Sequence, residues 1–581
     1  MTAVGWRAVL VDPQAVGVAE PAEAASLLRR WGGSWPAGLG RMVDVVVGRM
    51  SVLVVFDREV DRARIAEALG RPAAVAPDDF DPGERSAGTG AGANRPPIVI
   101  PVRYDGDDLH SVADACGLST DEVIRRHQAA TYRVAFLGFT AGFAYLDGLD
   151  PLLGIARRST PRTRVPAGSV AIADGQCAVY PRSTPGGWHL LGTTSFTVWD
   201  DAADPPAVLE PGRLVQFRDD RSAAPTRSGE RRAALSAATS GAAPDRRAAP
   251  DRRAAPDRGA APDRGAAPDR GAHAGSIDGG RALVVHMPGF GATVQDAGRP
   301  GWAHLGVSAS GALDPDAWRL GNRLVGNPTL PDGRGAASIE VVLGGFECTA
   351  TAPVWVAVTG ADGPVQIDGA PAAHGVPLAL RPGQRLRVGV ATDGLRRFVA
   401  VSGGVDVPTV LGSRSTDTLS GLGPEPLAAG TVLAVGPIST DPPGLFPGPA
   451  PVAGSARDGS GQPGEPLAVR VALGPDDEHV ANTAALFDNV WRIGADTSRV
   501  GVRLDGDATL AWATDREQPS SGMAAGAIQV PRDGRPIVFL ADHPTTGGYP
   551  VVGVVHPADL AALAQRQPGA AVRFIVVTRK R

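Results

Sequence analysis

Aromatic, glycine, proline and arginine residues are concentrated between residues 136 and 199. This stretch contains the runs FLGFTAGFAYL (136–146), PRTRVPAGS (161–169) and YPRSTPGGWH (180–189). Glycine and proline fix loop geometry, aromatic rings supply packing surfaces, and arginine supplies a rigid fork of hydrogen-bond donors. Tight barrel turns would use some of the same residues for backbone reasons alone. The composition favours a binding site, whose predicted substrate-binding residues are Arg162, Tyr180 and Trp188.

Polar side chains beside glycine recur in the loops of the second half, between residues 293 and 550. Glycine lets the backbone approach a ligand closely, and neighbouring hydroxyl, amide and guanidinium groups can then grip an anion. Any one of these loops taken alone is typical of a capped turn, whereas the ordered set favours a ligand site. The predicted substrate-binding residues of this half are Gln295, Arg299, Ser310, Asn322, Ser415, Asp417, Arg499, Gln529, Asp542, Thr545, Thr546 and Tyr549.

Three side chains are candidates for proton transfer or electrostatic catalysis: Asp296, Asp314 and His127. Two of them have a plainer interpretation. Asp314 directly precedes a proline and an apolar stripe, as a helix N-cap does. His127 lies near a predicted helix end, where an imidazolium stabilises the helix dipole. His189 and His543 carry the same ambiguity, and no metal site is predicted.

Lysine is almost absent from the chain. The one lysine is Lys580, next to the end, while the other basic residues are arginine. A Walker P-loop lysine and a Schiff-base lysine in a folded core are therefore excluded. Biotin, which is carried on a lysine, would have to arrive on another protein. A GC-rich genome that replaces lysine by arginine would produce the same bias.

The bulk composition excludes further classes. A formal net charge of −4 argues against a nucleic-acid-binding protein. The three cysteines lie far apart, which argues against a disulfide scaffold and a cysteine zinc site. The N-terminus lacks the pattern of a secretion signal, and no apolar run is long enough to span a membrane. We expect a soluble cytoplasmic protein.

A low-complexity repeat divides the chain. Residues 242–271 repeat Ala-Ala-Pro-Asp-Arg followed by Arg or Gly, a composition that cannot bury apolar surface and predicts a disordered tether. A second break in composition runs from Pro442 to Pro466. The predicted units are a small α+β domain (1–92), a barrel (93–220), the linker (221–276), a β-rich subdomain (277–445) and a second β-barrel (446–581).

Short apolar runs predict mostly strands. A hairpin is expected over residues 42–56, and helices over 22–30, 60–69, 107–116 and 120–129. In the second half the predicted helix begins after Asp314 and stops at Gly326. Strands are predicted at 98–104, 282–286, 354–359, 385–390, 398–402, 467–473 and 572–577.

The motifs together resemble a known family. The first half resembles allophanate hydrolase subunit 1, also described as carboxyltransferase subdomains C and D or as the B-type component of 5-oxoprolinase. The second half resembles allophanate hydrolase subunit 2, carboxyltransferase subdomains A and B, or the C-type component of 5-oxoprolinase. The matching motifs are GFxxGFAYL (138–146), PRxxVPAGSVAIA (161–173), YPxxxPGGW (180–188), QDxGRxG (295–301), SGALD (310–314), NxLVGN (322–327), SRSxD (413–417) and DxxTTGGYP (542–550).

The resemblance implies cyclophilin-like β-barrels with a small α+β N-terminal domain, and two halves that dock on each other. Two positions depart from the family pattern: Ala141 stands where proline is usual, and Leu313 where methionine is more frequent. An insertion at 330–334 follows LVGN. None of these departures removes a charged group.

Three functions are compatible with the resemblance. The first is an ATP-dependent 5-oxoprolinase, a hydrolase of a cyclic amide that would use ATP, with Mg²⁺, and a separate LamB/YcsF-type protein as the A-type component. The second is the carboxyltransferase of a urea-carboxylase-like system, with carboxybiotin on another protein. The third is a non-catalytic binding protein of the kinase-inhibitor type, and a homo-oligomer is compatible with any of them. We favour the first, because no biotin carboxylase or biotinyl domain is fused to this chain.

Overall fold

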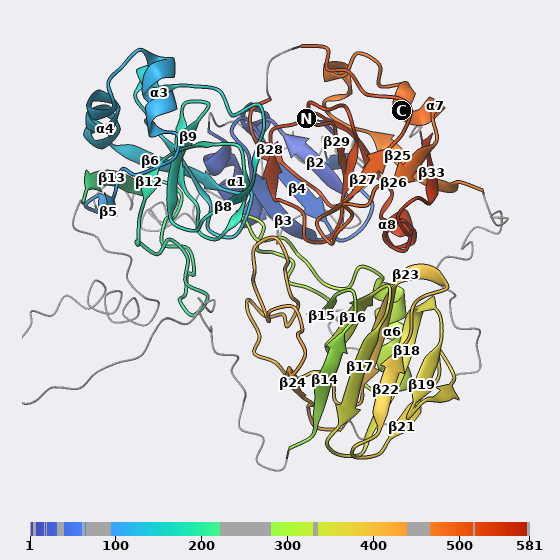
Figure 1. Cartoon of the computed structure of the whole chain (residues 1–581). Helices are drawn as coiled ribbons and strands as arrows, with labels where there is room; N and C mark the ends of the chain where they lie inside the picture. The colour runs from blue at the N-terminus through green and yellow to red at the C-terminus, as the bar shows by residue number, and fades with distance from the viewer. Residues whose placement is uncertain are drawn as a thin grey trace, which may run out of the picture.

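The computed structural model describes residues 2–3, 7–16, 18, 20–31, 40–60, 64–65, 95–220, 280–328, 335–438, 465–514 and 518–577. Within these ranges strands dominate, so the predicted β-rich α+β fold is confirmed (Figure 1). The linker predicted over 221–276, most of the helix predicted over 60–69 and most of the break at 442–466 lie outside the described residues. We call the residues up to 220 the first lobe and those from 280 onward the second lobe.

A four-stranded sheet opens the first lobe, in the order β1–β2–β4–β3, with helix α1 packed on it. Strands β3 and β4 form the predicted hairpin. The bounds are β1 Thr2–Ala3, β2 Ala8–Val11, α1 Pro21–Trp31, β3 Met42–Val47 and β4 Val52–Phe56.

Both faces of this small sheet are buried. Successive side chains of a strand point to opposite faces, so Val52 and Val54 pack in the first lobe with Leu28, whereas Leu53 packs against Met523 of the second lobe. Figure 1 shows the blue sheet between the first-lobe barrel and the red C-terminal barrel. The N-terminal sheet therefore joins the two lobes.

The rest of the first lobe is a seven-stranded sheet in the order β12–β9–β10–β7–β6–β13–β5. A bridge between Arg103 and Thr193 brings its two edge strands together, as in a barrel. The bounds are β5 Ile98–Val102, β6 Tyr132–Leu137, β7 Ala144–Asp147, β9 Ser169–Ala173, β10 Gln176–Val179, β12 His189–Thr193 and β13 Leu214–Asp219, with the short pair β8 Arg162–Val165 and β11 Thr184–Gly186 beside it.

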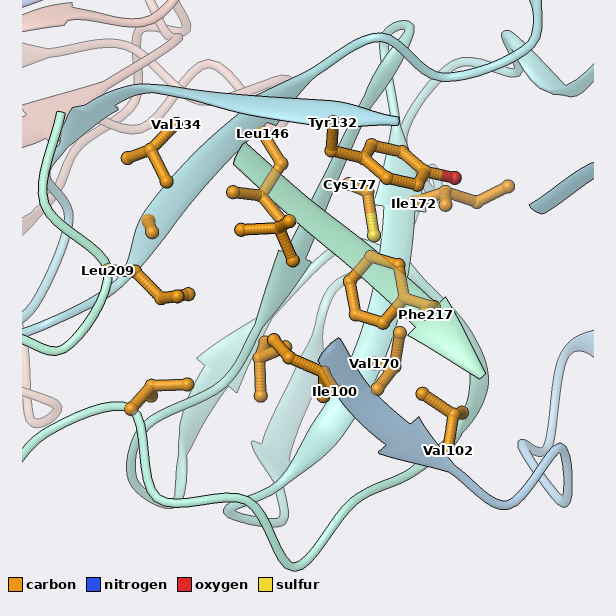
Figure 2. Close-up of a cluster of buried hydrophobic side chains, with 14 of the residues drawn as sticks. Ile100, Val102, Tyr132, Val134, Leu146, Val170, Ile172, Cys177, Leu209 and Phe217 are labelled. Atoms are coloured by element: carbon orange, nitrogen blue, oxygen red, sulfur yellow. The ribbon is translucent and has the colours of Figure 1, made fainter. Parts of the chain in front are cut away.

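Apolar side chains from these strands fill the barrel, including Ile100, Tyr132, Val170 and Phe217 (Figure 2). Ala141, the departure from the usual proline, is buried in the same core. Helices α3 (Leu109–Cys116) and α4 (Thr120–Ala129) match the predicted segments, and the Ser119 hydroxyl caps α4 by accepting from the Glu122 amide at 3.2 Å.

The first part of the second lobe is a sandwich of two antiparallel sheets. Their facing apolar side chains, such as Val285, Phe346, Val358 and Val399, form one core. One sheet has the order β20–β19–β22–β17–β14–β24 and the other β15–β16–β23–β18–β21. The bounds are β14 Ala282–Pro288, β15 Ala292–Gln295, β16 Ser338–Val342, β17 Phe346–Ala350, β18 Val354–Asp362, β19 Val365–Ile367, β20 Ala370–Ala372, β21 Leu378–Leu380, β22 Arg385–Val388, β23 Asp393–Val401 and β24 Val432–Ala434.

Helix α6 (Pro315–Leu324) packs against β18 and β23 of this sandwich. Proline at its first position and an aspartate before it are the predicted start signals. The Asp314 carboxylate accepts from the Ala317 amide at 3.0 Å. Gly326, at a φ of 77°, follows the last turn, where a left-handed residue ends a helix at low steric cost.

The chain ends in a closed barrel, with the strand order β25–β32–β29–β30–β27–β26–β33. Its bounds are β25 Leu467–Leu473, β26 Trp491–Ile493, β27 Gly501–Asp505, β29 Ala527–Gln529, β30 Ile537–Phe539, β32 Val551–Val555 and β33 Ala571–Val576. Helices α7 (Ala485–Asp488) and α8 (Pro557–Ala564) and the pair β28 (Ser521–Gly522) and β31 (Thr546–Gly547) accompany it. Within the described ranges, no helix combines the length and the apolar character needed to cross a membrane.

Candidate functional site

A cleft of about 280 Å³ lies between the two lobes, and we call it the interlobe cleft. Both lobes supply its walls, through the GFAYL, YP and PGGW motifs on one side and the TTGGYP motif on the other. Its lining includes Phe139, Phe143, Tyr145, Arg157, Arg158, Tyr180 and Trp188 of the first lobe and Ser520, Gln529, Pro544, Thr546, Gly548 and Tyr549 of the second. The cleft thus brings together five predicted residues: Tyr180, Trp188, Gln529, Thr546 and Tyr549.

An aromatic cluster forms the first-lobe wall. The ring of Phe143 makes edge-to-face contacts with Tyr145, Tyr180 and Trp188, at centroid separations of 5.1, 5.1 and 5.6 Å. Such contacts fix ring orientation, because the electropositive edge of one ring meets the electronegative face of another. Burial raises the pKa of the Tyr180 phenol, so this hydroxyl stays neutral. The four rings line the cleft while remaining almost completely buried in the first lobe.

At two glycines of the motifs, neighbouring atoms lie too close to the backbone to leave room for a side chain. A Cβ at Gly186 would lie 2.3 Å from the Tyr180 hydroxyl, and a Cβ at Gly138 would lie 2.5 Å from the Thr546 side chain. Both distances are far inside van der Waals contact. A side chain at Gly186 would therefore clash with the aromatic wall, and one at Gly138 would clash with the contact between the lobes. Turn geometry is only part of the reason for glycine in these motifs.

Thr546 joins the two lobes at the cleft. Its hydroxyl oxygen accepts from the Phe139 amide at 2.7 Å and lies 3.1 Å from the Tyr145 hydroxyl. Phe139 holds a φ of 62°, which is unusual for a non-glycine residue. The Thr545 amide in turn donates to the Phe139 carbonyl at 3.2 Å. This contact fixes the GFTAGF loop against the TTGGYP loop.

Arginines reach the cleft, but they are Arg157 and Arg158 rather than the predicted Arg162. Arg157 pairs with Asp174 at 2.8 Å and donates to the Ser520 hydroxyl at 3.1 Å, across the lobe boundary. Arg158 donates to Asp108 at 2.8 Å while about a third of its side chain is exposed. The sequence signal was present, because these two arginines come shortly before the PR motif.

Arg162 donates to the same Asp108 oxygen, also at 2.8 Å, and is not part of the cleft lining. Burial alone would raise the pKa of Asp108. Hydrogen bonds from Arg162 and from the Leu190 amide outweigh burial and hold this pKa below its ordinary value. Asp108 is therefore an ionised anchor that holds both arginines, and sequence reasoning missed it.

The predicted carboxylate Asp296 lies inside a loop junction. Its oxygens accept from the Ser413 and Ser415 hydroxyls at 2.6 Å each, from the Arg414 amide at 2.7 Å and from the Gly298 amide at 2.8 Å. These donors saturate the carboxylate and join the QDAGR and SRSTD loops. The geometry favours a structural role for Asp296 and for the predicted Ser415.

A second buried network contains Arg499 and Asp542. Arg499 binds Asp542 at 2.9 Å and Glu340 at 2.8 Å, and Asp542 also accepts from Ser310 at 2.7 Å. Burial opposes ionisation of Asp542, yet the charge of Arg499 prevails and lowers its pKa. Nearby Asp417 accepts from Ser308 and Ser420, but burial and the Asp542 charge raise its pKa. This network connects the sandwich to the C-terminal barrel.

Other predicted residues of the second lobe also have buried partners. Gln295 donates to the Thr416 carbonyl at 2.9 Å, and Arg299 donates to the carbonyl oxygens of Val410 and Ser415. Asn322 donates to the Ala336 carbonyl, and Asp314, besides capping α6, accepts from Gln565. None of these four side chains belongs to the cleft lining.

His127 lies in the core of the first-lobe barrel. Its ring nitrogens contact the Tyr104 hydroxyl at 2.8 Å and the Cys177 sulfur at 3.3 Å. Complete burial lowers its pKa to about 3, so the imidazole is neutral at physiological pH. The interpretation as a charge at a helix end does not hold for this neutral side chain, and its place in the core gives no support to the predicted proton transfer.

Two predicted residues line a different cavity. Ser310 and Thr545 border a larger space on the other side of the segment 540–546, which we call the second cavity. Leu313, the departure from the usual methionine, also lines it. The predicted site residues thus separate into cleft, second cavity and buried networks. Among the described residues, no group of three His, Cys, Asp or Glu side chains is placed to hold a metal ion.

Comparison with known proteins agrees with this division into lobes. Residues 2–209 match the family described as carboxyltransferase domain, subdomain C and D, and residues 305–576 match carboxyltransferase domain, subdomain A and B. The chain is 35% identical over 300 residues to the C-type component of 5-oxoprolinase from Escherichia coli K12, covering 50% of this chain and 90% of that protein.

The first lobe has a comparable relative. Over 123 residues the chain is 50% identical to the B-type component of 5-oxoprolinase from Escherichia coli O157:H7, a match that covers 21% of this chain and 56% of that protein. The crystal structure of TTHA0988 superposes with a TM-score of 0.72 at 30% identity, covering 98% of this chain and 99% of that one. The chain therefore belongs to the carboxyltransferase-domain family, with subdomains C and D in its first lobe and A and B in its second.

Proposed function

We propose that this chain combines the B-type and C-type components of an ATP-dependent 5-oxoprolinase and that 5-oxoproline binds in the interlobe cleft. The observation that carries this proposal is that motifs of both lobes line one cleft. Relatives named as these two components of 5-oxoprolinase match the first and second lobes respectively. A site made jointly by both explains why the two units are fused in one chain.

The cleft suits a small cyclic amide with a carboxylate. Its volume of about 280 Å³ lies near the lower end for small-molecule pockets, which fits a five-membered lactam. We assign the substrate carboxylate to Arg158, whose guanidinium has donors beyond the one that Asp108 accepts. The lactam ring then lies on the aromatic wall around Phe143. The acidic neighbour Asp108 orients the arginine.

A lactam resists hydrolysis because resonance makes its carbonyl carbon a poor electrophile. With ATP bound, a phosphoryl group would pass to the lactam oxygen and ADP would leave. One water would then add to the carbon and the C–N bond would break, with the nitrogen taking a proton, and a second water would hydrolyse the resulting acyl phosphate to glutamate and phosphate. Preorganised donors near the oxygen stabilise the charge that develops there. In the cleft, the hydroxyls of Tyr145 and Ser520 are candidates for this role.

The nucleotide requires a second protein in this proposal. The described residues offer no cluster of acidic or imidazole ligands for the magnesium ion of Mg-ATP. The chain also lacks a P-loop lysine, since its one lysine is Lys580. We therefore assign the metal-nucleotide site to a separate LamB/YcsF-type protein that docks over the cleft. The fused chain would supply the lactam site.

The test is release of glutamate from 5-oxoproline and ATP, measured with the full chain alone, the LamB/YcsF-type protein alone and the two together. We expect turnover only with both proteins. With 5-oxoproline below its KM, Arg158→Gln should abolish most of this turnover, whereas Arg125→Gln, on the exposed surface of α4, should not. Absence of glutamate in the combined reaction, or equal turnover by Arg158→Gln, would refute the proposal.

A further inference from the structure

Gln529 places a side-chain amide in the interlobe cleft, and among the described lining residues no other side chain is an amide. It ends strand β29 of the C-terminal barrel, which pairs with β30 and β32. The pairing with β32 shifts in register at Gln529, and such β-bulges redirect side chains beside functional sites. Gln529 is 4% exposed. The barrel therefore holds a nearly buried amide at the surface of the cleft.

The nitrogen of this amide is fully engaged by the protein. Nε2 donates to the Tyr549 carbonyl at 3.0 Å and lies 3.4 Å from the Met523 sulfur, a weak acceptor. Turning the amide over would set its oxygen against the Tyr549 carbonyl, which also can only accept, so the observed orientation is the favourable one. A Cβ at Gly547 would lie 2.7 Å from Nε2. The first glycine of the TTGGYP motif thus leaves the room that this side chain occupies.

The oxygen of the same amide has no such partner. Within the described ranges, no group donates a hydrogen bond to Gln529 Oε1, although an amide oxygen can accept two. Buried polar groups nearly always have a partner, because an unmade hydrogen bond costs more than a made one contributes. Since Gln529 lines the cleft, a ligand bound there is in a position to supply the missing donor.

The charges of the lining indicate which donor fits Gln529. The charged side chains of the described lining, Arg157 and Arg158, are both cationic, and their carboxylate partners Asp174 and Asp108 lie outside it. A cationic donor would therefore meet like charges and no carboxylate in the lining. A neutral N–H or O–H carries no such penalty. The lactam of 5-oxoproline has a neutral N–H, whereas its carboxylate and its carbonyl can only accept.

We propose that Gln529 Oε1 accepts the lactam N–H of the substrate and thereby restricts the cleft to cyclic amides with an unsubstituted nitrogen. This inference rests on the proposed binding of 5-oxoproline in the cleft. With the carboxylate on Arg158 and the N–H on Gln529, two contacts from opposite lobes orient the ring. When the C–N bond breaks, the nitrogen takes a proton and still carries N–H groups, so Oε1 can keep its hydrogen bond. Gln529 selects and orients the ring and transfers no proton.

The test compares two ligands that differ at one ring atom. The first is 5-oxoproline, and the second is its carbocyclic analogue of the same handedness, a cyclopentanone carboxylate with CH₂ in place of N–H. In calorimetry with the full natural chain, we expect the ketone to bind at least about tenfold more weakly, because it leaves Oε1 without a donor. Equal binding of the two would overturn the assignment of Gln529 and leave the proposed function standing. No binding of 5-oxoproline would overturn both.

A variant separates the N–H contact from the weaker hydrogen bonding of a ketone oxygen, which is the same in every chain. Gln529→Met removes the acceptor at similar side-chain volume and should reduce the preference for 5-oxoproline to less than about threefold. Gln216→Met, which removes a side-chain amide from β13 outside the cleft, should keep the preference of the natural chain. If Gln529→Met keeps the same preference with an unchanged Tm, the assignment is wrong. If Gln529→Met does not fold, the comparison of the two ligands on the natural chain decides.

Discussion

The motifs of the first lobe and the loops of the second lobe use similar residue types in different ways. In the first lobe, Tyr180 and Trp188 belong to the surface of the interlobe cleft. In the second lobe, Asp296, Arg499 and Asp542 lie inside loop junctions with their hydrogen bonds satisfied by neighbouring loops. Polar residues beside glycine therefore mark well-determined loops, and only their contacts show whether they line a cleft or hold each other.

The largest expected effect comes from breaking the second-lobe network. Arg499→Met would leave Asp542 as a buried carboxylate without its cation and Glu340 with Arg396 alone, and removal of one partner of such a pair costs about 3–5 kcal/mol. We expect a loss of this size in chemical denaturation. Arg319→Met, in a surface pair with Asp316, should change stability by less than about 1 kcal/mol. Equal losses of stability for both variants would contradict the structural role of Arg499 in the second-lobe network.

On the cleft side, Arg158→Gln should affect substrate binding rather than folding. A hydrogen bond to a charged group contributes about 1.5–3 kcal/mol, and 1.4 kcal/mol is a factor of ten. KM for 5-oxoproline should therefore rise about 10- to 100-fold with little change in Tm. Steady-state kinetics with the LamB/YcsF-type protein present would measure it. A lower Tm with an unchanged KM would instead assign Arg158 a structural role like that of Arg499.

Neighbouring threonines allow a sharper version of the comparison. Thr546→Val removes the acceptor of the Phe139 amide at the lobe boundary and should cost about 1–3 kcal/mol, because that amide loses its partner. The same change at Thr545, whose hydroxyl has no partner among the described residues, should be neutral or stabilising. Thermal denaturation of both variants measures the two losses of stability. A larger loss for Thr545→Val than for Thr546→Val would show that Thr546 does not hold the two lobes together.

The smallest effect is a dependence on pH. The pKa of Asp108 lies below its ordinary value in the folded chain, so its contribution is complete above the unfolded pKa of about 4. That contribution is lost as the pH falls through the lower folded pKa. Asp108→Asn should therefore show a shallower loss of stability between about pH 4 and pH 2 than the natural chain. Parallel curves would mean that Asp108 does not stabilise the arginines.

Much of the fold could be predicted because its signals are local. The hairpin at 42–56, helix α4 after Ser119 and helix α6 after Asp314 all follow from short apolar runs, capping and helix-ending residues. Burial of the second-lobe loops could not be predicted, because it depends on contacts between segments more than a hundred residues apart, such as Asp296 with Ser413. The importance of Arg158 depends likewise on Asp108, fifty residues before it.

The N-terminal sheet has a thermodynamic consequence. With Val52 and Val54 buried on one side and Leu53 on the other, it can dissociate from neither lobe without exposing apolar surface. Melting of one half therefore removes part of the core of the other. Calorimetry should show one cooperative heat-absorption peak for the whole molecule, whereas two halves that were merely tethered would give two.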